Sequence, residues 1–277
     1  MKHLPIFVIC SFLTACSSVI VEDDNCSYES FGLIYPAKSV KQTTYHAVVA
    51  YGEISKGYVT ANQLRNYYAE FNEQGKISEW TLFGSGGSVF DKQYFVYNSD
   101  NRLISKSGGV SRDYSFSYEY DGGSLSLISY VASDGTKKLS KYTNAGNNVT
   151  KLETYLNGTL RSVQKIYYKN NKRIKFTSID KTNGEERVIS TFSYDDIGRR
   201  TLIHSNGTEM RIEYNGNGAV SSVSGGELND GGLFMINSEM SNSYTYKYDS
   251  KGNWIERIDF EEPSHLPIEI TERIIQY

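Results

Sequence analysis

The residues that could carry out acid–base or metal chemistry are few and scattered. His46, His204 and His265 lie far apart and have no second ligand at the short spacing typical of zinc sites. Adjacent residues on a strand face opposite sides, so a neighbouring pair of carboxylates cannot flank one glycosidic bond. Three such pairs occur beside predicted turns or strand ends: Glu185-Glu186, Asp195-Asp196 and Glu261-Glu262. We interpret all of these as surface or turn residues and expect no metal or other cofactor.

Motifs for nucleophilic catalysis and phosphate binding are also missing. The sequence has no Gly-x-Ser-x-Gly elbow and no Gly-x-x-x-x-Gly-Lys-[Ser/Thr] loop. Residues 84–88 (GSGGS) lack the lysine and the following helix pattern, so we interpret them as a turn. The net charge of −3 and the scattered basic residues argue against a nucleic-acid partner. The favoured function is a non-enzymatic interaction or scaffolding surface for a protein or glycan. An envelope hydrolase with a loop-built active site is the alternative.

The N-terminus carries the one motif with a specific chemistry. Lys2 precedes an apolar stretch over residues 4–13, which is signal-peptide anatomy and too short for a transmembrane helix. The stretch ends in Leu13-Thr14-Ala15-Cys16, which resembles the bacterial lipobox. The resemblance implies cleavage after residue 15 and acylation of Cys16, and two or more acyl chains give lasting attachment. A plain secretory signal cut elsewhere is the other interpretation.

These features predict three segments and an envelope location. Residues 1–15 are the expected signal peptide, 16–40 a lipidated N-terminus and tether, and 41–277 a single β domain. Cys26 is left alone after cleavage and lipidation, so no intramolecular disulfide is expected. The mature protein should be anchored on a membrane, the outer one if the organism has two.

Short runs of alternating aromatic and polar residues predict β-strands. In 114–120 (YSFSYEY) and 244–248 (YTYKY) the aromatic residues share one face, as period-two alternation requires. Turn residues rich in Asn, Asp and Gly separate the runs, because these residues tolerate the positive φ of tight hairpins. Tyr58–Tyr68 is ambiguous between a helical turn and a strand, and we assign a strand.

The turns recur about every 20–27 residues, which indicates a repeat array. No proline occurs between residues 37 and 262, as uninterrupted hydrogen-bond ladders require. The expected fold is all-β, an antiparallel meander of repeated hairpins that forms one broad, curved sheet or a partly closed barrel. Trp254, Ile258 and Phe260 should share one face, and the Glu- and Pro-containing segment 261–273 should protect a free sheet edge.

The segment 244–260 (YTYKYDSKGNWIERIDF) resembles the YD repeat, also called the RHS repeat. Weaker copies are 192–202 (FSYDDIGRRTL) and 118–125 (YEYDGGSL), and in 94–104 and 212–220 Asn replaces Asp. The resemblance covers about residues 67–260, and the chain is much shorter than family members that form closed shells around a toxin. It implies a β-sheet built from hairpins.

The 23 tyrosines have two possible roles. Cross-strand aromatic pairs would stabilise a thin sheet, which we favour. Alternatively, tyrosines would form a contact platform for an unidentified protein or glycan partner.

Overall fold

The computed structural model describes residues 27–277 except 111–112, 146–147, 206 and 230–232. The described chain is almost entirely β-sheet, with two short 3₁₀ helices. The helices are η1 (Tyr28–Phe31) and η2 (Gln63–Arg65). The strands are β1 (Ser39–Ala50), β2 (Glu53–Val59), β3 (Tyr67–Phe71), β4 (Ile77–Phe83), β5 (Val89–Tyr97), β6 (Leu103–Gly108), β7 (Tyr114–Asp121), β8 (Ser124–Ala132), β9 (Lys137–Asn144), β10 (Val149–Leu156), β11 (Thr159–Lys169), β12 (Lys172–Ile179), β13 (Glu186–Tyr194), β14 (Arg200–Ser205), β15 (Thr208–Tyr214), β16 (Val220–Asn229), β17 (Leu233–Tyr248), β18 (Trp254–Glu261) and β19 (Leu266–Gln276).

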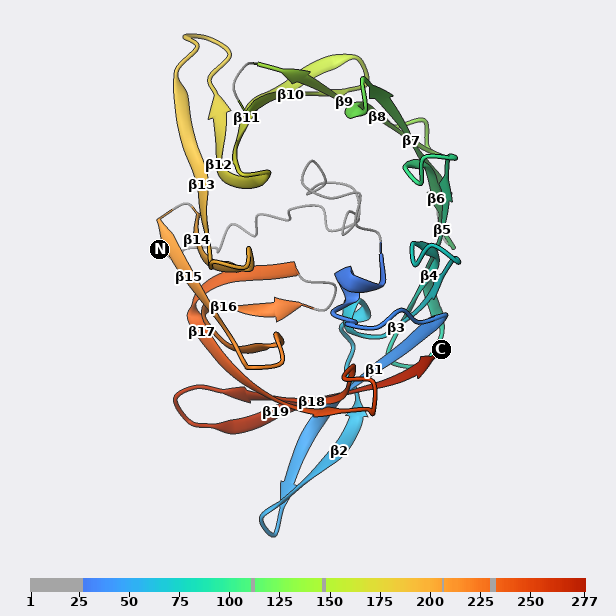
Figure 1. The fold of residues 1–277 in the computed structure, drawn as a ribbon, viewed down its shortest axis with the longest axis vertical. Coiled ribbons are helices and arrows are strands. Elements are labelled where there is room, and N and C mark those ends of the chain that lie inside the picture. Colours follow the sequence, from blue (N-terminus) through green and yellow to red (C-terminus); the bar gives the residue numbers. More distant parts are fainter. Residues whose placement is uncertain (1–26, 111–112, 146–147, 206, 230–232) are drawn as a thin grey trace.

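Eighteen of the nineteen strands form a closed antiparallel barrel (Figure 1). From β3 to β19 each strand pairs with the next along the chain. The ring closes at β1, which pairs with β19 along Ser39–His46 and, on its other edge, with β3 along Ser39–Gln42. The predicted all-β meander is confirmed, and the sheet closes on itself completely. β2 lies outside the ring, and among the described strands it pairs with β1 alone.

Five of the connecting turns share one hydrogen-bond pattern, centred on an Asn or Asp side chain. The Oδ1 atom accepts a hydrogen bond from the backbone N–H of the residue four positions later. In the turn at Asp249, the distance from the Asn253 nitrogen to the Asp249 Oδ1 atom is 2.9 Å. The backbone N–H of the third following residue donates to the carbonyl oxygen of the Asn or Asp. That third residue has a positive φ each time, +87° at Gly252. The five turns begin at Asn72, Asn98, Asp195, Asn215 and Asp249.

Tyrosines near four of these turns, and Tyr120 near the end of β7, join neighbouring strands through their hydroxyl groups. The Tyr214 hydroxyl donates to the Arg200 carbonyl oxygen at 2.8 Å, and Tyr246 donates to Val220 at 2.7 Å. In both cases the acceptor is the first residue of the preceding strand. Tyr97, Tyr120 and Tyr194 make corresponding contacts with Ile77, Leu103 and Arg173. The aromatic–Asp or aromatic–Asn pattern therefore encodes a repeated structural unit. In this unit a tyrosine hydroxyl donates a hydrogen bond to a backbone carbonyl of the neighbouring strand, and a turn anchored by the Asp or Asn side chain follows.

Gly225 fits its position for steric reasons. It has φ +74° and lies at a register shift between β16 and β17. A Cβ there would overlap the carbonyl oxygen of Glu209 on β15. We expect Gly225→Ala to lower the free energy of unfolding by about 2–5 kcal/mol, from left-handed backbone strain and overpacking.

Gly216→Ala is the matched control for Gly225→Ala, because a Cβ at Gly216 meets nothing within 4 Å and its φ is not in the left-handed range. We expect a change within about 0.5 kcal/mol. Urea unfolding of both variants measures the difference. Equal stabilities would show that the bulge at Gly225 is misplaced.

The two faces of the barrel wall differ in chemistry. On β7, Phe116 and Tyr118 are buried among the core side chains inside the barrel, and the intervening Ser117 is exposed. The outer face carries ion pairs such as Lys92–Glu79 and Lys247–Glu256, at 2.8 and 2.7 Å. Many tyrosines are thus interior packing residues, as the structural interpretation expects.

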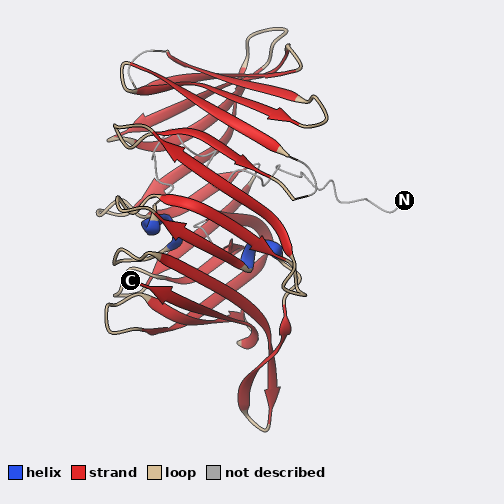
Figure 2. Ribbon diagram, turned by 90° about the vertical axis from the view of Figure 1, so that its right-hand side faces the viewer, coloured by secondary structure: helices blue, strands red, loops and turns tan. Residues whose placement is uncertain are grey.

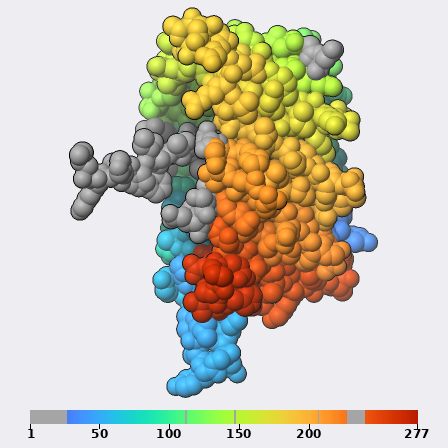
Figure 3. All heavy atoms as spheres, turned by 90° about the vertical axis from the view of Figure 1, so that its left-hand side faces the viewer, coloured from blue at the N-terminus to red at the C-terminus, as the bar shows by residue number. Residues whose placement is uncertain are grey.

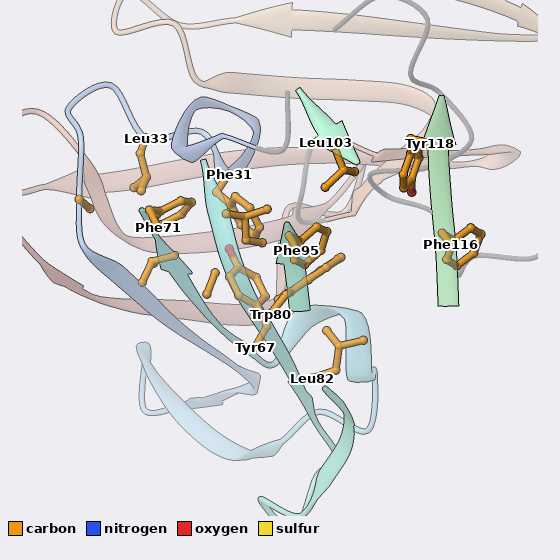
Figure 4. Close-up of a cluster of buried hydrophobic side chains, with 14 of the residues drawn as sticks. Phe31, Leu33, Tyr67, Phe71, Trp80, Leu82, Phe95, Leu103, Phe116 and Tyr118 are labelled. Carbon is orange, nitrogen blue, oxygen red and sulfur yellow. The ribbon is translucent and has the colours of Figure 1, made fainter. Parts of the chain in front are cut away.

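Residues 27–38, the N-terminal segment of the described chain, lie inside the barrel and complete the larger core cluster. Phe31 contacts Tyr67, Phe71 and Trp80, with ring centroids 5.4–5.8 Å apart (Figure 4). Residues 27–38, within the expected tether, therefore contribute to the core, and β1 starts at Ser39. A second cluster contains Ile203, Met210, Ile212, Val223 and Tyr244.

Three sequence expectations need correction. Tyr58–Tyr68 is not one strand, because β2 ends at Val59 and η2 precedes β3. Trp254 does not share a face with Ile258 and Phe260. Trp254 faces inward, whereas Ile258 and Phe260 lie on the opposite face, where they pair with Thr245 and Ser243. A bulge after Trp254 changes the alternation. The C-terminal segment is not a free edge, since β19 pairs with both β18 and β1.

Candidate functional site

A buried cluster of charged side chains lies where the barrel closes. Arg257 on β18 donates from Nε and Nη2 to the two carboxylate oxygens of Asp259, at 2.6 and 3.0 Å. Arg65 of η2 donates to Asp259 at 3.1 Å and also to Glu269 on β19. Arg65, Arg257 and Asp259 are almost fully buried, so these charges interact in a weakly screened environment.

The cluster continues across the closing strands, where Arg273 bonds to neutral side chains and two threonines bond to each other. Arg273 on β19 donates to the Gln42 side-chain oxygen at 2.8 Å and to the Tyr67 hydroxyl at 3.1 Å. Thr44 on β1 and Thr271 on β19 form a hydrogen bond of 3.0 Å. Together these contacts join β1, β3, β18 and β19, which are the first and last strands of the ring. We call the nine residues the seam cluster: Gln42, Thr44, Arg65, Tyr67, Arg257, Asp259, Glu269, Thr271 and Arg273.

The N-terminal segment is fixed to the same part of the wall by Asn253. The Asn253 Oδ1 atom accepts the backbone N–H groups of Ile34 and Tyr35, at 2.6 and 3.1 Å. Its Nδ2 atom donates to the Tyr277 hydroxyl at 2.8 Å. Trp254 lies beside Gly32, and the Arg273 guanidinium is 3.3 Å from the centre of the Trp254 ring. The segment therefore has a defined position against β18 and β19.

A cavity of about 330 Å³ lies between residues 29–34 and the wall formed by β16 to β19. Its side walls are apolar, and Arg257 and Arg273 belong to its lining. The rim is open to solvent at Glu29, Ile34 and Asn217. We call this space the seam cavity; its apolar lining includes Phe31, Leu33, Val220, Tyr246 and Trp254.

The β1–β2 hairpin is the second candidate site and projects beyond the barrel (Figures 2 and 3). Its tip turn contains Tyr51, which is fully exposed, and Gly52, both with positive φ. Val48, Val49 and Ile54 are also exposed. Because pairing with β19 ends at His46, residues 47–50 of β1 have one edge without a strand partner among the described strands.

The structure places most of the residues considered for chemistry in local contacts. His46 contacts the Tyr58 ring, His204 contacts Glu209, and His265 lies 3.0 Å from Glu262. In the described ranges, no group of three His, Cys, Asp or Glu residues is placed to hold a metal. Cys16, the expected lipid attachment site, and Cys26 lie outside the described residues.

The paired carboxylates form hydrogen bonds within turns and on the outer face of the barrel. Asp195 caps its turn through Arg199, and Glu262 accepts a hydrogen bond from Ser243. Hydrogen bonds from Lys165 and Tyr167 lower the pKa of Glu186 to about 2. Because folding lowers this pKa, the ionised Glu186 carboxylate stabilises the folded state. The stabilisation is present above the pKa that the carboxyl has in the unfolded chain, and it is lost as the pH falls toward 2.

Sequence reasoning did not identify the seam cluster or the seam cavity. A partial signal was present, because Arg257 and Asp259 are two residues apart and must share a strand face. Arg65, the second partner of Asp259, is distant in sequence, as are Gln42 and Tyr67, the partners of Arg273. Only ring closure brings these residues together.

Comparisons with known proteins give no functional assignment. No family model matches the chain, and no curated protein matches it. A porin-like protein from Bacteroides uniformis is 10% identical over 87% of this chain and 98% of that chain, with a TM-score of 0.39. A TcdB2-TccC3 structure is 14% identical over 83% of this chain and 14% of that chain, with a TM-score of 0.30.

The Tc holotoxin pore of Photorhabdus luminescens is 13% identical over 85% of this chain and 15% of that chain, also with a TM-score of 0.30. No helix in the described part of the chain is long and apolar enough to span a membrane.

Proposed function

We propose that this protein is a lipoprotein of the bacterial cell envelope whose YD-type repeat barrel is a non-enzymatic interaction module. It is tethered through acylated Cys16 and presents the β1–β2 hairpin to a partner protein. The observation that carries the proposal is the group of exposed apolar side chains, Val48, Val49, Tyr51 and Ile54, on a hairpin that projects beyond the barrel wall. The repeated hydrogen bonds from tyrosine hydroxyls to backbone carbonyls, together with the turns anchored by Asp or Asn side chains, support the assignment to YD-type repeats.

The outer wall supports a barrel that lies in water beside the membrane. Lipid-facing barrel surfaces carry an apolar band, on which charged side chains cost about 2–4 kcal/mol each at the midplane. Here the Lys151–Glu153 pair lies along β10 and the Lys165–Glu186 pair joins β11 to β13 on the outer face. Further pairs join β4 to β5 and β17 to β18. A lipid anchor supplies the membrane contact that such a wall does not.

The hairpin has the features of a protein contact. An isolated two-stranded ribbon is only marginally stable in water, and an uncharged edge invites another strand. Residues 47–50 (AVVA) carry no charge on either face. A partner that adds a strand or provides an apolar groove would cover both the unpaired edge and the valines. A glycan would not satisfy an apolar edge in this way.

Anchoring is tested by Cys16→Ser. We expect the variant to lose its acyl chains and to leave the detergent phase in a phase-partitioning experiment, because the cysteine sulfur carries the lipid. Mass spectrometry of the N-terminus measures the lipid directly. A Cys16→Ser protein that is still processed and still enters the detergent phase would contradict the anchor.

The hairpin contact is tested by a photo-crosslinking amino acid at Val49 in the full-length protein in its native envelope. Val188 on β13 is the matched control, since the two valines are 55% and 54% exposed. We expect one discrete adduct at position 49 and at least about tenfold less at position 188, as contact energy is concentrated at a few residues. Equal labelling, or no adduct at position 49, would contradict the proposal.

A further inference from the structure

We propose that the seam cavity binds an amphipathic anion, an apolar chain or ring that bears one carboxylate or phosphate group. This inference goes beyond the interaction role of the hairpin and does not depend on it. The apolar part would lie between the N-terminal segment and the wall, and the charged group would face the two arginines.

The walls of the cavity suit an apolar body. Phe31 and Leu33 form one side and are buried in the larger core cluster. Val220, Tyr246 and Trp254 form the other side, with the Tyr246 and Trp254 rings 5.8 Å apart. The volume of about 330 Å³ lies at the lower end of the range for small-molecule sites. Such walls favour an alkyl chain or a single ring system over a bare ion.

The charged lining suits an anionic group. Arg257 and Arg273 are 1% and 6% exposed, and both contribute to the cavity lining. The planar guanidinium fork matches carboxylate and phosphate oxygens, and burial strengthens such contacts. Glu29 is the carboxylate of the lining, and it lies exposed at the rim, where water screens it.

Both arginines are held in place by the protein before a ligand enters. Asp259 binds Arg257 at two points, and Gln42 and Tyr67 accept hydrogen bonds from Arg273. Asn253 fixes the opposite wall by binding the backbone of Ile34. A preformed site loses little conformational entropy on binding, which favours affinity for a small ligand.

The ligand class is tested by calorimetry on the signal-free chain, residues 16–277 with Cys16→Ser. Decanoate is the probe, decan-1-ol supplies the same chain without charge, and acetate supplies the charge without the chain. We expect decanoate to bind at least about tenfold more tightly than either control. Binding of decan-1-ol with equal affinity would overturn the anionic requirement, and undetectable decanoate binding would overturn the site.

The location is tested by Ala219→Phe, which places a ring in the cavity mouth. Ala219 contributes only backbone atoms to its turn, so the melting temperature should be unchanged. We expect decanoate to change the fluorescence of Trp254 in the parent protein, because Trp254 lines the cavity. In Ala219→Phe we expect this change to be lost and the decanoate affinity to fall at least tenfold. Undiminished binding in this variant would overturn the proposal.

The second tryptophan, Trp80, lies outside the cavity lining, and Trp254→Phe identifies the signal. Phosphatidylglycerol vesicles added as competitors distinguish the source of the anion. Displacement of decanoate supports a membrane lipid, and retention supports a free anion of the same chemistry.

Discussion

Asp259→Ala is expected to lower the free energy of unfolding by about 3–5 kcal/mol, because removing one partner leaves buried charge uncompensated. Asp259 accepts hydrogen bonds from both Arg257 and Arg65. Without it, the Arg257 guanidinium would remain inside the barrel without the carboxylate that accepts its Nε and Nη2 donors. The effect should exceed that of removing any ion pair on the outer wall.

Urea unfolding of the signal-free chain measures this difference, with Glu153→Ala as the control. Glu153 pairs with Lys151 on the outer face, where the two side chains are 22% and 40% exposed. Exposed pairs contribute about 0–1 kcal/mol, so this variant should unfold nearly as the parent does. A loss below about 1.5 kcal/mol for Asp259→Ala would mean that the seam cluster is hydrated.

Local parts of this fold are predictable because their determinants are adjacent in sequence. The turn at Asp249 needs only the Asp side chain and a residue that tolerates positive φ three positions later, and Gly252 supplies it at +87°. The alternation in 114–120 likewise assigns Phe116 and Tyr118 to the interior. Repetition of these units predicts a meander.

Closure and the candidate sites are not predictable in the same way. A single-residue bulge after Trp254 turns Ile258 to the opposite face, and the alternation pattern alone does not locate that bulge. Pairing of β1 with β19 joins residues more than two hundred positions apart, as between Ser39 and Gln276. The number of strands and their stagger, which determine whether a sheet closes, are properties of the whole chain.

Deletion of residues 266–277 is expected to abolish cooperative unfolding and to cause self-association. This segment contains β19, which hydrogen bonds to β18 on one side and to β1 on the other. Its removal exposes two edges, and unpaired backbone N–H and C=O groups recruit other chains. It also removes Glu269, Thr271 and Arg273 from the seam cluster, so Arg65 and Gln42 lose buried partners. Opening the ring should therefore have a larger effect than any single substitution.

A shortened β1–β2 hairpin is the control for this deletion. Removing Val48, Val49, Ile54 and Ser55 takes out two cross-strand pairs and preserves the facing of every remaining side chain. Because β2 lies outside the ring, this variant should stay monomeric and melt cooperatively. Light scattering and calorimetry of both variants decide between closure and a simple row of hairpins. If the chain without residues 266–277 remained monomeric and melted as one unit, an open sheet would be sufficient for folding, and pairing of β1 with β19 would not be what stabilises the barrel.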